Sequence, residues 1–243
     1  TNFGVASNPE FLREGAAISD FMRPDRVVIG SNEEDAIAIM RDLYRPLYLI
    51  ETPIVITSLE AAELIKYAAN AFLATKITFI NEIANLCDAI GCDVHDVARG
   101  MGMDNRIGRK FLHPGPGYGG SCFPKDTRAF TKVGDAFNVE TLVVDSVIEA
   151  NERQRQAMIP KIERLVGDFT GKQIAVLGLS FKPETDDMRE APSIDIIKEM
   201  QSRGAKIKAF DPVAMDEAKH SLSNIEYATD EYDAIKGADA LVI

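Results

Sequence analysis

The sequence has few cysteines, no excess of positive charge and no long run of apolar residues. Its 243 residues carry a formal net charge of −11. General binding to nucleic acid or to an anionic membrane needs a positive surface, so we expect neither partner. No apolar run reaches the roughly 18 residues of a membrane-spanning helix. The first residues, Thr1-Asn2-Phe3-Gly4, lack the basic and apolar regions of a signal peptide.

Cysteine occurs three times, as Cys87, Cys92 and Cys122. A small, odd number is a poor disulfide framework and is typical of a reducing compartment, so we expect a cytoplasmic protein. The three histidines have no metal-ligand spacing with one another or with cysteine, so we expect no metal site.

Neither end of the sequence is typical of a complete protein. The chain does not begin with Met, and it stops at residues 240–243, Ala-Leu-Val-Ile, which read as half of a strand. We therefore expect an excerpt of a longer chain.

Hydrophobic periodicity predicts an α/β protein with a helical middle. Residues 1–57 read as strand, helix and strand, with an extended stretch at 46–53. Thr57 and Glu60 have the spacing of a capping box ahead of a long helix that ends at Gly91. The remaining predictions are helices at 93–99 (closed by Gly100), 126–137, 140–167, 193–202 and 232–236, a loop at 101–124, and strands of a parallel sheet at 174–178, 206–210 and 240–243.

A glycine-rich stretch at residues 115–120 precedes Cys122, and a predicted helix follows it. Glycine lets the backbone approach a ligand closely. Helix N-termini and nearby cations such as Lys125 favour a reactive thiolate, and Asp126 offers a base or water-holder. From spacing alone, a flexible glycine loop beside a buried cysteine explains the pattern equally well.

Two further pairs have a spacing of four residues. Glu10 and Glu14 share a face if their segment is helical, and paired carboxylates can perform acid–base work. In isolation a solvated, charged turn explains this pair better. Lys66 and Asn70 lie on the predicted long helix, where a lysine can stabilise an oxyanion. The common alternative is a surface lysine.

The turn at 178–183 follows a predicted strand, as a phosphate-binding turn does, but it lacks the G-x-G-x-x-G pattern.

Taken in order, the segments resemble the UDP-glucose/GDP-mannose dehydrogenase family over nearly the whole chain. The segments that carry the resemblance are Asn8-Pro9-Glu10-Phe11-Leu12-Arg13-Glu14, Glu63-Leu64-Ile65-Lys66-Tyr67-Ala68-Ala69-Asn70, Asn105-Arg106-Ile107-Gly108, Gly117-Tyr118-Gly119-Gly120-Ser121-Cys122-Phe123-Pro124-Lys125-Asp126, and Phe181-Lys182 with Arg189-Glu190.

The resemblance implies three parts. Residues 1–57 correspond to the end of an NAD-binding Rossmann domain, 58–168 to a complete helical central domain that forms a homodimer, and 169–243 to the start of a Rossmann-like domain for the nucleotide sugar. The implied activity is an NAD-dependent, four-electron oxidation of UDP-glucose to UDP-glucuronate. The alternatives are the GDP-mannose branch of the family, a non-catalytic fragment that only dimerises, and a thiol hydrolase, which needs a histidine partner for Cys122.

The resemblance also assigns roles to residues. Cys122 is implied to be the nucleophile that carries the thiohemiacetal and thioester, with Asp126 and Glu14 activating water and Lys66 and Asn70 stabilising an oxyanion. Arg106 is implied to reach the substrate across the dimer interface. The implied substrate-binding residues are Glu10, Phe11, Leu12, Arg13, Glu14, Lys66, Arg106, Phe111, Leu112, His113, Pro114, Gly115, Gly119 and Lys182, and the implied NAD-binding residues are Glu14, Lys125 and Arg189.

Overall fold

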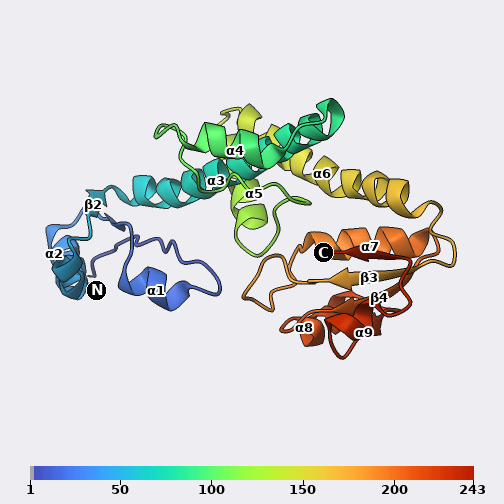
Figure 1. Cartoon of the computed structure of the whole chain (residues 1–243). Helices are drawn as coiled ribbons and strands as arrows, with labels where there is room; N and C mark the ends of the chain where they lie inside the picture. Colours follow the sequence, from blue (N-terminus) through green and yellow to red (C-terminus); the bar gives the residue numbers. More distant parts are fainter. Residues whose placement is uncertain (1–2) are drawn as a thin grey trace. The chain divides into compact units, whose positions relative to one another are not determined.

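The computed structural model describes residues 3–243, apart from the side chains of 48–50 (Figure 1). Thr1 and Asn2, which open the predicted first domain, lie outside the described residues. The chain divides into two compact units, Thr1–Asn70 and Ala71–Ile243.

The first unit contains a parallel pair of strands joined by a helix. Strand β1 (Val27–Gly30) pairs with β2 (Ile54–Thr57), and α2 (Glu34–Leu43) connects them. The order of strand, helix and strand is as predicted, but the second strand lies later in the chain than the predicted one. The extended stretch predicted at 46–53 is wrong, because η1 (Arg45–Ile50) is a 3₁₀ helix there. Proline near the start of such a turn loses no hydrogen bond, so Pro46 fits. A short helix, α1 (Ala17–Met22), has no buried residue and so no apolar periodicity to predict it.

Helix α3 (Leu59–Ile90) begins in the first unit and ends in the second, with the predicted bounds. Its N-terminal cap differs from the prediction: Ser58 Oγ, rather than Thr57, accepts a hydrogen bond from the Ala61 N–H at 3.2 Å. At the other end Gly91 has a positive φ of 80°, which suits glycine after a helix.

Three more helices follow: α4 (Val94–Gly102), α5 (Phe123–Ala136) and α6 (Leu142–Val166). Gly100 was expected to close α4 but lies inside it, so that prediction is wrong. Helix α5 begins three residues earlier than predicted, because Pro124 fits in its first turn.

The second unit also contains a parallel sheet, as predicted, in the order β5-β4-β3-β6. Along the chain, β4 pairs with one edge of β3 and β5 pairs with β4. Strand β6 then pairs with the other edge of β3. In open α/β sheets, ligands bind at the carboxyl ends of strands where the order reverses. Two short elements, α8 and β5, were not predicted. The elements are β3 (Gln173–Leu177), α7 (Pro192–Ser202), β4 (Lys206–Phe210), α8 (Met215–Ser221), β5 (Glu226–Tyr227), α9 (Glu231–Ile235) and β6 (Ala240–Val242).

The main core lies between this sheet and its helices. Ile174 of β3, Ile197 of α7 and Phe169 are at most 1% exposed. Ile159 of α6 joins the same cluster. In Figure 1 α7 lies on one side of β3 and α9 on the other. Helix α6 is therefore packed both against the other central helices and against the sheet, and this packing positions the loop described next.

Candidate active site

Cys122 is the N-cap residue of α5, at the end of the glycine loop, which we define as residues 115–122. Its side chain is half-buried, and Sγ lies 3.6 Å from Ser121 Oγ. A helix N-terminus is a position where the backbone favours negative charge. The structure therefore places the predicted nucleophile at the N-terminus of α5.

Asp126 lies one turn along α5 from Cys122, and its N–H donates to the Cys122 carbonyl at 2.9 Å. The side chain of Asp126 is 1% exposed and forms an ion pair with Lys125. The Lys125 side chain is 65% exposed, so its ammonium is at the surface. The structure thus brings the three residues together, with Lys125 engaged by Asp126.

Polar side chains of α3 and α6 hold the glycine loop. Asn81 Oδ1 accepts from the Gly115 N–H at 2.8 Å, and Gln154 Nε2 donates to the Gly115 carbonyl at 2.8 Å. Asn151 accepts from the Tyr118 N–H at 2.8 Å and donates to its carbonyl at 3.1 Å. Sequence reasoning missed these residues. The sequence signal that could have identified them is an amide side chain on the buried face of a helix, because a buried amide needs a hydrogen-bond partner.

The glycines of the loop also allow close packing against the segment that connects β3 to α7, residues 178–191. Gly120 has a φ of 78°, and a Cβ there would lie 2.6 Å from the Phe181 ring. Its N–H donates to the Arg189 carbonyl at 2.9 Å. A Cβ on Gly119 would collide with the Glu190 carbonyl oxygen. Glycine is therefore needed here for packing against protein, besides any approach to a ligand.

Residues 111–114 lead into the glycine loop. Phe111 has a φ of 63°, and its ring lies 6.1 Å from that of Phe123. Leu112 is 4% exposed, and its side chain packs in the core with Ile80. His113 is exposed, and Pro114 is half-buried.

Arg106 lies on the surface, in the loop after α4. Its side chain is 89% exposed, and its Nη2 donates to Asp104 Oδ2 at 2.6 Å. This hydrogen-bonded pair raises the pKa of Arg106 and lowers the pKa of Asp104. The carboxylate orients the guanidinium while leaving most of it accessible.

Two predicted cations lie on the connecting segment. Lys182 Nζ is 5.3 Å from the centre of the Phe181 ring. Arg189 Nε and Nη2 donate to the two oxygens of Asp187 at 2.8 and 2.9 Å, and the Arg189 side chain is 67% exposed.

Asp211, at the end of β4, holds the start of this segment. Its carboxylate accepts from the N–H groups of Leu179 and Ala214, each at 2.8 Å, and from those of Ser180 and Val213. Burial alone raises the pKa of Asp211, but these backbone hydrogen bonds together bring that pKa below its usual value. Sequence reasoning missed this role, because the bonded groups are backbone.

In the first unit, residues 8–13 are irregular, so Glu10 and Glu14 do not share a helical face. Side-chain hydrogen bonds replace the helix: Asn8 Nδ2 donates to the Val28 carbonyl at 2.7 Å. Arg13 makes a two-pronged pair with Asp20, at 2.9 and 2.6 Å, which raises the pKa of Arg13.

Lys66 reaches this irregular segment from α3. Its Nζ donates to the Glu10 carbonyl at 2.6 Å and to Glu10 Oε1 at 2.8 Å. The Phe11 ring lies 3.6 Å from the Arg26 guanidinium and 5.5 Å from Lys66 Nζ. Asn70 is buried one turn further along α3. The structure thus brings Glu10, Phe11 and Lys66 together, and sequence reasoning missed Arg26.

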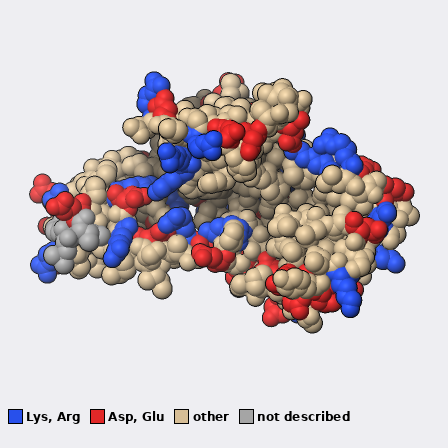
Figure 2. Space-filling model, in the orientation of Figure 1, with Lys and Arg blue, Asp and Glu red and all other residues tan. Residues whose placement is uncertain are grey.

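Within residues 3–243, no hydrogen bond joins a histidine to Cys122, and no group of three metal-ligating residues occurs. None of the helices described is long and apolar enough to cross a membrane. Acidic side chains gather over α8 and α9 (Figure 2).

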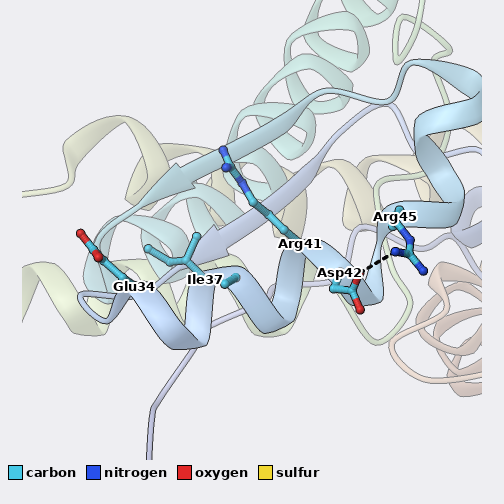
Figure 3. Close-up of a pocket in the computed structure, with 6 residues that line it drawn as sticks. Glu34, Ile37, Arg41, Asp42 and Arg45 are labelled. Carbon is cyan, nitrogen blue, oxygen red and sulfur yellow. Dashed lines mark ion pairs between the residues drawn. The ribbon is translucent and has the colours of Figure 1, made fainter.

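A surface hollow lies along α2 in the first unit (Figure 3). Glu34, Ile37 and Arg41 line it, and Asp42 pairs with Arg45 at 3.2 Å. None of these is a predicted site residue.

Three models of the UDP-glucose/GDP-mannose dehydrogenase family match this chain: the NAD binding domain at residues 1–48, the central domain at 60–153 and the UDP binding domain at 175–243.

Relatives and solved structures agree with those matches. A UDP-glucose 6-dehydrogenase of Rhizobium meliloti (strain 1021) is 53% identical over 98% of this chain and 55% of its own length. UDP-glucose 6-dehydrogenase TuaD of Bacillus subtilis (strain 168) is 51% identical over 100% of this chain and 52% of its own. The structure of a UDP-glucose dehydrogenase from Pyrobaculum islandicum, 40% identical, superposes with a TM-score of 0.94 over 98% of this chain and 55% of that one. The chain therefore spans about half the length of the relatives that it matches.

Proposed function

The chain belongs to the UDP-glucose/GDP-mannose dehydrogenase family, and on that premise we propose that it serves the NAD-dependent oxidation of UDP-glucose to UDP-glucuronate. The observation that carries the proposal is the placement of Cys122 at the N-cap of α5, one turn from buried Asp126. The names of the relatives favour UDP-glucose over other nucleotide sugars.

We propose three functional parts with the bounds expected from the sequence. Residues 1–57 form the end of an NAD-binding domain, 58–168 a central domain and 169–243 the start of a UDP-sugar domain. The positions of the three family matches support this division.

Two exposed cations fit an anionic cofactor such as NAD. The side chains of Lys125 and Arg189 are 65% and 67% exposed, and each is oriented by a neighbouring carboxylate. The first turn of α2 is a poor site for the cofactor's diphosphate, because it carries Glu34 and Asp35. We therefore propose that Lys125, Arg189 and Glu14 contact NAD. When bound, NAD⁺ accepts one hydride in each of the two oxidations.

Cys122 acts between the two oxidations in this proposal. The first removes a hydride from C6 of the sugar and a proton from its hydroxyl, which leaves an aldehyde. Cys122 Sγ adds to the aldehyde carbon and forms a thiohemiacetal. Loss of a second hydride, with the hydroxyl proton, gives a thioester. Water then attacks the carbonyl, the C–S bond breaks, and the carboxylate and the free thiolate result.

Further residues are proposed to supply charge and to activate water. Asp126, buried beside Cys122 on α5, is the proposed group that positions water, together with Glu14. Lys66 and Asn70 share a face of α3 and are proposed to stabilise the oxyanion. The Lys66 ion pair with Glu10 orients the ammonium before substrate binds.

The proposed contacts for the nucleotide sugar are described for each unit by itself. In the second unit, Lys182 and the segment after β3 lie at the carboxyl end of the sheet, where ligands of such sheets bind. Arg106 is accessible for a substrate phosphate. The remaining proposed contacts are Glu10, Phe11, Leu12, Arg13, Glu14, Lys66, Phe111, Leu112, His113, Pro114, Gly115 and Gly119.

The test is the yield of NADH from each nucleotide sugar. It uses the native polypeptide, which here means this chain with any sequence that flanks it in the cell. We expect two NADH per UDP-glucose and none from GDP-mannose. A preference for GDP-mannose would move the chain to the other branch. Hydrolysis of a thioester without NADH formation would instead favour a thiol hydrolase.

We also propose a homodimer formed through α3. Phe72, Phe79, Leu86 and Ile90 are 66%, 45%, 55% and 67% exposed, and their spacing of seven, seven and four places them on one helix face. Exposed apolar stripes of this kind mark interaction surfaces. The occupant proposed is the same stripe of a second copy.

Light scattering tests the dimer. We expect twice the mass of one chain, and Phe79→Glu should halve it. The matched control is Leu165→Glu on α6, which is 88% exposed and off the stripe. A monomeric unmodified protein refutes the proposal. A dimer without NADH formation would support the non-catalytic alternative. The cytoplasmic location remains a proposal that rests on three free cysteines.

A further inference from the structure

Arg155 of α6 is a buried arginine that the proposed chemistry does not use. Its side chain is 7% exposed. Buried guanidinium groups are costly unless they are paired and hydrogen-bonded. The buried position of the Arg155 guanidinium therefore depends on the groups that accept its hydrogen bonds.

These partners belong to two separate segments. Arg155 Nη2 donates to the Tyr118 carbonyl of the glycine loop at 2.9 Å. The same nitrogen donates to the Glu190 carbonyl, before α7, at 3.0 Å, and Nη1 donates to Asp195 Oδ2 at 2.9 Å. One side chain thus joins the loop that ends at Cys122 to the segment that leads into α7.

The surrounding contacts make this junction specific. Gly117, with a φ of 113°, passes so close to α6 that a Cβ there would lie 3.4 Å from Arg155 Cγ. The Gly120 N–H donates to the Arg189 carbonyl at 2.9 Å. On the other side Arg128 of α5 pairs with the Glu190 carboxylate, which raises the pKa of Arg128. The glycine loop is therefore enclosed between α6 and residues 189–190.

We propose that Arg155 is a positioning residue for Cys122. Arg155 holds the glycine loop, which ends at Cys122, against the segment 189–195. The proposal rests on the role of Cys122 proposed above. The role assigned to Arg155 involves no contact with a reacting atom. Arg155 acts through the Tyr118 carbonyl, four residues before Cys122. A displacement of about 1 Å at a reacting group can lower a rate by about 100-fold.

The first test measures kinetics of the native polypeptide with UDP-glucose and NAD. We expect Arg155→Met to lower kcat by about 100-fold, with less than a threefold change in the dissociation constant of UDP-glucose. Arg155→Lys, which keeps the positive charge and one donor nitrogen, should recover part of kcat. The matched control is Arg153→Met, two residues away, because Arg153 is 75% exposed and pairs only locally with Glu149.

The second test needs no activity. Hydrogen exchange of the Tyr118 and Gly120 amides should accelerate at least tenfold in Arg155→Met, with β3 and β4 unchanged and Arg153→Met unaffected. Equal exchange in Arg155→Met and the unmodified protein overturns the proposal, as does an unchanged kcat. A uniform acceleration in all segments also overturns it, because that result indicates general destabilisation. If the unmodified protein forms no NADH while the loop amides behave as expected, the proposed function fails and the structural junction stands.

Discussion

Replacing Gly119 by alanine tests whether the glycine loop is packed against the segment before α7. The added Cβ would collide with the Glu190 carbonyl oxygen and would lie 3.1 Å from the Pro192 Cδ. That oxygen cannot move freely, because it accepts a hydrogen bond from Arg155 at 3.0 Å.

The expected cost has two parts. Overpacking of this kind costs about 1–3 kcal/mol. Loss of the hydrogen bond from a charged donor adds about 1.5–3 kcal/mol where the carbonyl is displaced. Together they predict a loss of roughly 2.5–6 kcal/mol in the free energy of unfolding of the second unit. For a unit of this size, the corresponding fall in Tm is roughly 5–24 °C.

The assay is urea and thermal unfolding followed by far-UV circular dichroism, since the chain has no tryptophan. Gly115→Ala is the matched control in the same loop: a Cβ there meets nothing within 4 Å, so we expect a change of no more than about 1 kcal/mol. Equal midpoints for Gly119→Ala and Gly115→Ala would refute the packing role of Gly119.

Three further predictions concern single residues. Cys122→Ser in the native polypeptide should block thioester formation and so abolish UDP-glucuronate; chromatography that finds normal product would show that Cys122 is not the nucleophile. Asp211→Asn should flatten the acid side of the stability–pH curve. The folded pKa of Asp211 is lowered, so its contribution is present above the ordinary value of about 3.9 and is lost as pH falls through the folded pKa; urea midpoints at several pH values check this, and an unchanged slope would contradict it. Ser58→Ala should destabilise the start of α3 by about 1 kcal/mol while Thr57→Ala does not, because Ser58 accepts the Ala61 N–H; thermal melts that rank the two variants equally would contradict the cap assignment.

Local signals in the sequence predicted most of the elements. Residues 59–90 carry a cap ahead of them and a glycine after them, so both bounds of α3 were predicted from neighbouring residues alone. The strands of the parallel sheet were predicted because buried β3 is a continuous apolar run. The failures are also local: Pro46 fits a 3₁₀ turn as well as an extended stretch, and β5, with two residues, is too short to show a period.

The sequence by itself determined that this protein alternates strands and helices around a helical middle, and that Cys122 follows a glycine loop at the start of a helix. Only the tertiary structure decided what the glycines face: Gly119 and Gly120 pack against residues 181–190, some 60 positions later. It alone showed that Arg155 and Asp211 hold that junction and the turn after β3. The physical reason is that these contacts end on backbone carbonyls and N–H groups, which every residue carries, so no residue type marks them in the sequence.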